Sequence, residues 1–209
     1  MRRANAQLQS DRRTEILDAA ERCFARSGFH GASMQEICTE ANMSPGNLYR
    51  YFASKEALIA GISERNRADA VASFALVDQS AEFFEGLAEL ARYHLVDRTD
   101  TEVALCAEIM SESRRNPEIA RLYHDIEIDI KARLAAMLRR AAERGEIRAD
   151  LDIEAATTAL MVLGDGMSWR RSVEPGFDPE RVLPLILTMV RCLLAKPGAC
   201  AGNPGESSR

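Results

Sequence analysis

Apolar and polar residues recur with a helical period of about 3.6 along most of the chain. Near the N-terminus, one narrow arc of a helical wheel is apolar and the opposite arc is polar. The apolar arc consists of Ile16, Leu17, Ala20 and Phe24, and the polar arc of Thr14, Glu15, Asp18, Glu21 and Arg22. This first helix is expected to end near Ser27-Gly28, because glycine commonly terminates helices.

The second helix is expected to begin with a capping box, Ser33-Met34-Gln35-Glu36. In this motif the serine hydroxyl and the glutamate carboxylate each accept a hydrogen bond from a backbone amide that the helix start leaves unpaired. The predicted buried face consists of Met34, Ile37, Cys38 and Ala41. After a break at Asn42-Met43, Ser44 is a second N-cap and Pro45 takes the first helical position, where its missing N–H costs nothing.

The third helix is short and presents one polar face. It runs to about Phe52, with Leu48 and Phe52 on its buried side. The residues that face outward are Gly46, Asn47, Tyr49 and Arg50. A helix, a turn and a short helix of this kind match a helix-turn-helix, in which the second helix enters the major groove of DNA. By itself the pattern fits an ordinary helical hairpin equally well.

Further helices follow to the end of the chain, and no segment shows strand alternation, so the fold is predicted to be all-α with about nine helices. They begin after caps or breakers and are expected from Ser54 to the middle of the seventies and over 83–96, 101–115, 117–145, 152–169 and 178–194. The helix that starts after Asn116 keeps one apolar stripe until Gly145 ends it.

The last two predicted helices are apolar on more than one side. Residues 153–169 are apolar or small almost all round, and 182–194 have little polar surface beyond Thr188 and Arg191. A helix that is apolar on two sides needs two partners, and a second copy of the chain best explains the second one. We therefore predict a four-helix dimer interface. It is expected to include Leu160, Met167, Ile186, Met189, Val190 and Leu193.

Composition narrows the function classes. The chain has 209 residues, of which 46% are hydrophobic and 28% charged, which is ordinary for a soluble globular protein. No apolar stretch is long enough to span a bilayer, and the N-terminus lacks the apolar run of a signal peptide, so no membrane contact and a cytoplasmic location are expected. Five cysteines without a C-x-x-C pair suggest neither a disulfide framework nor a zinc site, so no metal or cofactor is expected.

Neither charge nor catalytic motifs favour an enzyme. The net charge is −5, whereas residues 1–60 carry eight basic and seven acidic side chains, which neither supports nor excludes DNA binding. His94 and His124 lack metal-ligand spacing, and no G-x-S-x-G, P-loop or paired-carboxylate arrangement is present. The chain is therefore not expected to be an enzyme. A helical protein that uses its N-terminal bundle only for protein contacts stays open as an alternative.

The run from Ile16 to Ile59, ILDAAERCFARSGFHGASMQEICTEANMSPGNLYRYFASKEALI, closely resembles the N-terminal signature of the TetR family. The segments AEIMSESRRNPEIARLY, Gly145-Glu146-Ile147 and DGMSWRR resemble more loosely the regulatory domains of its BetI-type and AcrR-type branches. The resemblance implies a ligand-responsive transcriptional regulator, most directly a repressor. It would bind a palindromic operator in double-stranded DNA as a homodimer, and a small-molecule effector would release it.

The resemblance also implies a domain division. Residues 1–55 would form the helix-turn-helix DNA-binding domain, 56–195 an antiparallel helical domain for ligand binding and dimerisation, and 196–209 a disordered tail rich in Gly, Pro and Ser. Effector identity, operator sequence and the choice between repression and activation are not encoded in any motif.

The DNA contacts that the resemblance implies agree with residue chemistry. Ser33 and Ser44 lie at helix N-termini, where hydroxyls and free amides meet phosphates. On the outward face, Gly46 and Asn47 lie beside Arg50, whose guanidinium suits a guanine edge. Tyr49 is similar to the family's phosphate-contacting tyrosine. Lys55 is a cation in a first helical turn, where it opposes the macrodipole, so a bound phosphate would explain its position.

By analogy with relatives, the later helices are expected to enclose an effector cavity. Its predicted lining is Phe83, Phe84, Leu87, His94, Cys106, Met110, Tyr123, Ile126, Met161, Asp165 and Trp169. Asp165 stands on an otherwise apolar helix, so its carboxylate needs a partner or water. A structural bond to an arginine or a helix terminus is the favoured account, and a cationic ligand is the alternative.

Overall fold

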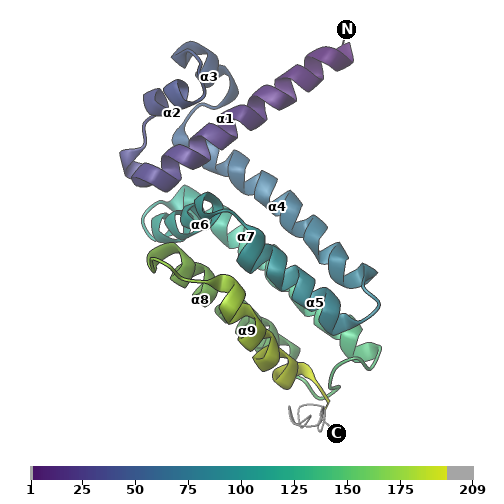
Figure 1. Cartoon of the computed structure of the whole chain (residues 1–209). Coiled ribbons are helices and arrows are strands. Elements are labelled where there is room, and N and C mark those ends of the chain that lie inside the picture. The colour runs from purple at the N-terminus through teal and green to yellow at the C-terminus, as the bar shows by residue number, and fades with distance from the viewer. Residues whose placement is uncertain (1, 197–209) are drawn as a thin grey trace, which may run out of the picture. The chain divides into compact units, whose positions relative to one another are not determined.

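The structure, a computed structural model, describes residues 2–196, without the side chains of residues 2–6, 76 and 78. Over these residues the chain forms nine α-helices and one π-helical turn, with no strand (Figure 1), so the predicted all-α class is confirmed. The helices are α1 (Arg2–Gly31), α2 (Met34–Glu40), α3 (Pro45–Tyr51), α4 (Lys55–Gln79), α5 (Phe83–Arg92), α6 (Asp100–Ser113), α7 (Pro117–Glu143), α8 (Ile153–Val173) and α9 (Pro179–Leu194), and the turn η1 spans Tyr93–Asp97.

The chain divides into two compact units. The first unit comprises Met1–Ala70 and Thr99–Glu127, and the second comprises Val71–Arg98 and Ile128–Arg209. Helix α6 therefore belongs to the same unit as α1, α2 and α3, and α4 and α7 each contribute to both units. These units do not follow the functional division predicted at residue 55, which stays a prediction. The predicted disordered tail, apart from Lys196, lies outside the described residues.

The first unit is built around the apolar faces of α1, α2, α3, α4 and α6. Its largest fully buried side chains include Phe24, Ile37, Leu48, Ile59 and Leu105. Because Leu105 comes from α6, this core joins the N-terminal helices to a helix that follows them by more than forty positions in the sequence. Helix α1 is broken where the sequence predicted its end, at Gly28, which has a φ of 68°.

The second unit has its own core between α5, α7, α8 and α9. The buried side chains include Phe83, Leu87, Leu138, Ile147 and Leu194. Gly145 ends the chain of helical residues after α7 with a φ of 70°, as the sequence predicted. Asp152 and Asp178 cap α8 and α9 by accepting hydrogen bonds from backbone amides of the first turn, so these helix starts are locally determined.

Candidate nucleic-acid interface and effector domain

Helix α3 is held in place from one side. Leu48 is fully buried and Phe52, at the C-cap, is 3% exposed. The guanidinium of Arg13 in α1 lies 4.4 Å from the centre of the Phe52 ring, a cation–π distance. Ser44 is the N-cap and Pro45 follows it, as predicted, but the Ser44 hydroxyl makes no capping hydrogen bond. The exposed hydroxyl and the unpaired first-turn amides therefore remain available to an acceptor such as a phosphate.

The opposite side of α3 faces outward. Tyr49 is 53% exposed, and Gly46 and Arg50 are also exposed, whereas Asn47 is half-buried. A Cβ built at Gly46 would meet no atom within 4 Å, so the backbone there is open to close approach. The outward face predicted from the sequence is thus formed, and its contacts with DNA stay predictions.

Arg50 differs from its neighbours in charge pairing. Among the described side chains of residues 7–70, it is the one cation that makes no hydrogen bond, ion pair or ring contact. The others are engaged as follows: Arg12 with Glu15, Arg13 with Phe52, Arg22 with Glu40, Arg26 with Glu36, His30 with Glu112, Lys55 with two carbonyls, Arg65 with Asp18 and Glu21, and Arg67 with Glu64. An exposed, unpaired guanidinium on a recognition helix is chemically suited to a base edge or a phosphate.

The start of α2 shows the predicted capping. The Ser33 hydroxyl accepts a hydrogen bond from the Glu36 amide at 3.1 Å. The Glu36 carboxylate also accepts from Arg26 Nη2 at 2.8 Å, and this bond is the main reason why the pKa of Glu36 lies below its ordinary value. Smaller contributions come from Ser27 and the Ser33 backbone. The cap therefore fixes α2, and Ser33 remains exposed at its N-terminus.

Lys55 has partners within the chain that the sequence did not reveal. Its Nζ donates to the carbonyl oxygens of Phe29 at 2.5 Å and Ala32 at 2.9 Å, and lies 4.5 Å from the centre of the Phe29 ring. These carbonyls stabilise a cation in the first turn of α4 without any phosphate. The argument that only a bound phosphate explains its position is therefore corrected, and a DNA contact of Lys55 stays a prediction.

A charged cluster between α1 and α4 was also missed. Arg65 Nη1 lies 2.6 Å from Asp18 and Nη2 lies 2.8 Å from Glu21, whose side chain is 11% exposed. Burial raises the pKa of Glu21, and the charge of Arg65 opposes that rise only in part. The sequence pattern placed Glu21 on the polar arc of α1, but Arg65, more than forty positions away, supplies the partner that allows its burial.

The residues predicted to line an effector pocket divide between the two units. Those in the first unit are Cys106, Met110, Tyr123 and Ile126, and those in the second are Phe83, Phe84, Leu87, His94, Met161, Asp165 and Trp169. Phe83 and Leu87 are buried in the second core, and Tyr123 packs against the first. Their grouping around one ligand stays a prediction.

His94 is buried within η1 and is tied to α4. Its Nε2 lies 2.8 Å from the hydroxyl of Ser73. Burial, together with the charge of Arg98, lowers the pKa of His94 from 6.5 to about 4. The same turn is held by Arg171 of α8, which donates to the carbonyls of Val96 at 2.9 Å and Arg98 at 2.6 Å. A π-helical turn is uncommon and often marks a functional position.

Asp165 does not make the bond that was favoured from the sequence. Within the described residues its carboxylate has neither a hydrogen bond nor an ion pair, although partial desolvation raises its pKa. The residue is exposed on α8, and Trp169, one turn further along, is 51% exposed. Both lie on the outer side of α8 in the single chain, where water satisfies the carboxylate.

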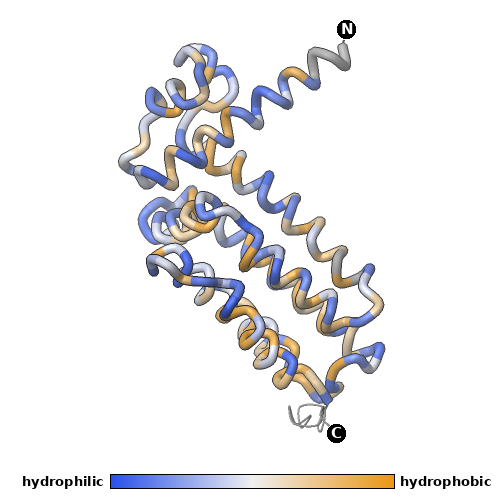
Figure 2. Tube along the Cα trace, viewed as in Figure 1, coloured by the Kyte–Doolittle hydropathy of each residue, from blue (hydrophilic) through white to orange (hydrophobic). Residues whose placement is uncertain are grey.

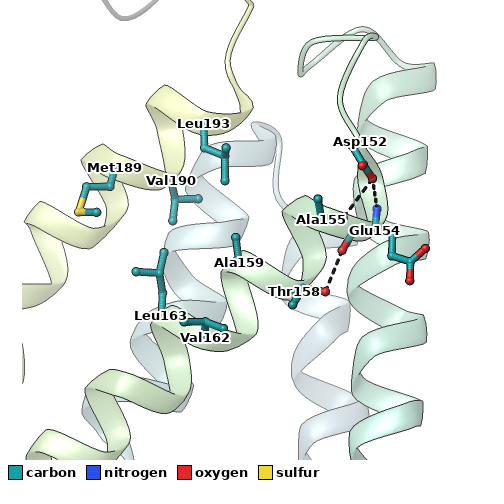
Figure 3. A pocket seen from close by; sticks show the side chains of 10 residues that line it. All are labelled: Asp152, Glu154, Ala155, Thr158, Ala159, Val162, Leu163, Met189, Val190 and Leu193. Atoms are coloured by element: carbon teal, nitrogen blue, oxygen red, sulfur yellow. Dashed lines mark hydrogen bonds between the residues drawn. The ribbon is translucent and has the colours of Figure 1, made fainter.

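Helices α8 and α9 present an apolar outer face. We define this α8–α9 face by its exposed apolar side chains: Val162, Trp169, Val173, Leu185, Met189 and Leu193. Figure 2 shows the C-terminal half of α9 as largely apolar. A groove of about 830 Å³ lies along the same face, with Glu154 and Thr158 at one side and Met189 and Leu193 at the other (Figure 3).

The structure corrects the predicted dimer residues in part. Met189 and Leu193 are exposed, whereas Met167 and Val190 are buried in the chain itself at 4% and 5% exposure. The remaining two, Leu160 and Ile186, pack against the second core. A helix that is apolar all round does not reveal which side is turned inward, so the sequence placed some core residues on the outer face.

Two further searches returned nothing among the described residues. No helix of residues 2–196 is long and apolar enough to cross a membrane. Within that same part of the chain, no three or more His, Cys, Asp and Glu side chains gather as a metal site.

Comparisons with known proteins cover most of the chain. Residues 16–62 match the family model of bacterial regulatory proteins of the tetR family, and residues 84–195 match that of the BetI-type transcriptional repressor C-terminal domain. The chain is 36% identical over 155 residues to the HTH-type transcriptional regulator UidR of Escherichia coli (strain K12), which covers 74% of this chain and 79% of that protein.

Two further relatives cover more of the chain. The HTH-type transcriptional repressor AcnR of Corynebacterium diphtheriae is 30% identical over 191 residues, which is 90% of this chain and 95% of that protein. The solved structure of Salmonella enterica GusR is 35% identical and covers 88% of this chain and 95% of its own, with a TM-score of 0.76.

Proposed function

We propose, from the premise that this chain belongs to the TetR family of bacterial regulatory proteins, that it represses transcription as a DNA-bound homodimer until a small-molecule effector releases it. The chain is a transcriptional regulator by family. The observation that carries the proposal is the outward face of α3, on which Tyr49 and the unpaired Arg50 are exposed. No catalytic role is proposed, and the site of action would be the cytoplasm, where operator DNA lies.

Each exposed group of the interface has a proposed role. Arg50 donates bidentately to a guanine edge, and Asn47 contacts an adenine or a phosphate. Tyr49, together with the amides and hydroxyls at Ser33 and Ser44, binds phosphates and sets the register of the protein on the duplex. Gly46 allows the backbone to approach the DNA closely, because no side chain stands there.

Dimerisation supplies the second half-site. A second copy would cover the α8–α9 face, because large apolar side chains such as Leu185 and Met189, at 67% and 59% exposure, are otherwise left in water. A two-fold dimer with recognition helices about 34 Å apart reads two successive major grooves, which requires a palindromic operator. The effector would bind in the later helices and change that separation.

The direct test is binding of the purified protein to its own promoter fragment, measured by fluorescence anisotropy at several salt concentrations. Wild type is expected to bind at nanomolar concentration. Arg50→Ala should cost about 1–3 kcal/mol and relax the base preference, whereas Tyr49→Phe should weaken all sequences alike. Arg139→Ala, which removes an exposed cation of the second unit, is the matched control and should bind as wild type. Equal binding by wild type and Arg50→Ala would refute the assignment of α3.

Lys55→Ala separates two roles for that residue. If its ammonium also contacts a phosphate, the slope of log affinity against log salt falls by about one. If it only holds the carbonyls of Phe29 and Ala32, thermal stability falls and the salt slope stays that of wild type.

A further inference from the structure

The connection between α1 and α2 is gripped by two carboxylates of α6. Glu108 Oε1 accepts a hydrogen bond from the Phe29 amide at 2.6 Å, directly after the break at Gly28. One helical turn further along α6, Glu112 Oε2 lies 3.0 Å from His30 Nε2, and the Glu112 side chain is only 3% exposed. Both contacts lie within the first unit.

The fit around Gly28 is tight. A Cβ built at Gly28 would lie 3.0 Å from Glu108 Oε1, so the carboxylate fills the space that a side chain would take. From another side, Lys55 binds the carbonyls of Phe29 and Ala32. The residues that lead into α2 are thus fixed both by the start of α4 and by α6.

The start of α6 is equally well fixed, to a helix of the second unit's core. Arg98 is the last residue before the α6 N-cap, Thr99, and its carbonyl accepts from Arg171 of α8 at 2.6 Å. Thr99 and Glu102 form a reciprocal capping box, with Glu102 Oε2 accepting from the Thr99 amide at 2.7 Å. Because one capped residue separates the Arg171 grip from the helix, a shift of the Arg98 carbonyl is carried into α6 with little slack.

We infer that α6 transmits the state of α8 to the DNA-binding helices through Glu108 and Glu112, with Arg171 as the input and the α1–α2 connection as the output. Glu108 is then a positioning residue for operator binding, since it acts through the Phe29 backbone and touches no DNA. The inference rests on the proposed function for its operator readout alone. Packed elements with two discrete arrangements carry such coupling between sites.

The first test needs no DNA and no effector. Hydrogen exchange of the Phe29 amide is measured in the full-length protein for wild type, Arg171→Met and Arg170→Met. Arg170 is the matched control, because its side chain is 67% exposed and pairs with Glu174 in its own helix. Arg171→Met is expected to speed exchange at Phe29 about fivefold or more, as for a typical coupling between sites. Equal exchange in the two variants would overturn the inference.

The second test is a double-mutant cycle on operator affinity with Glu108→Ala and Arg171→Met. The effect of Arg171→Met on the dissociation constant is expected to shrink about fivefold or more when Glu108 is already absent. Glu108→Gln, which keeps an oxygen acceptor for the Phe29 amide, should restore near wild-type coupling, and Glu118→Ala, an exposed glutamate of α7, should not change it. Additive effects would overturn the inference. Absence of any operator binding by wild type would refute the proposed function, while the exchange experiment still decides the α6 route.

Discussion

The pH dependence of folding should reveal His94. Its ring is buried in η1 against the Ser73 hydroxyl, and its pKa is lowered to about 4 in the folded chain. In the unfolded chain the imidazole has its ordinary pKa of about 6.5. Between these values the unfolded state binds the proton more tightly, so the stabilising effect is fully present above pH 6.5 and is lost as the pH falls toward 4.

The size of the effect follows from the two pKa values. The difference between 6.5 and about 4 corresponds to about 3 kcal/mol of unfolding free energy once the pH is below the folded value. About 2 kcal/mol of it is already lost at pH 5, where most carboxylates are still ionised. This is a large part of the stability of an ordinary domain.

The assay is urea unfolding of wild type and His94→Gln between pH 7.5 and pH 5, at one fixed protein concentration. Glutamine places an amide near the position of Nε2 and does not titrate, so the variant should lose about 2 kcal/mol less than wild type over this range. His124→Gln, at an exposed position of α7, is the matched control and should follow wild type. If wild type and His94→Gln lose stability in parallel, the ring is not held neutral by burial and the reasoning fails.

Two further predictions concern packing. Gly61→Ala should lower the melting temperature, because its Cβ would lie 2.9 Å from both Leu17 Cδ2 and Phe52 Cε1 in the core, and an overpacking cost of about 1–3 kcal/mol exceeds the gain in helix propensity of about 1 kcal/mol; Gly46→Ala, with open space around it, should not, and equal melting curves would contradict this. Met189→Glu should convert the dimer to a monomer in sedimentation velocity by placing a charge within the covered α8–α9 face, whereas a dimer that persists unchanged at micromolar concentration would place the interface elsewhere.

The helices and their ends were determined by the sequence alone. Ser33, Asp152 and Asp178 cap helices through bonds to amides two or three positions away, and Gly28 and Gly145 end helical segments with positive φ. All of these interactions join residues within one helical turn, so a local pattern contains what is needed to predict them. The same holds for the outward face of α3, since one buried leucine and the Ser-Pro start set its orientation.

Only the tertiary structure decided what lies between helices. Nothing local indicates that Lys55 binds the carbonyls of the α1–α2 connection, that Arg65 accompanies Glu21 into the core, or that α6 joins the N-terminal helices. The turn of α9 that buries Val190 and exposes Met189 was likewise open, because a helix that is apolar all round offers several equivalent sides to its own core. Such choices depend on partners far away in the sequence, and they become definite only when the packed core selects one side of each helix.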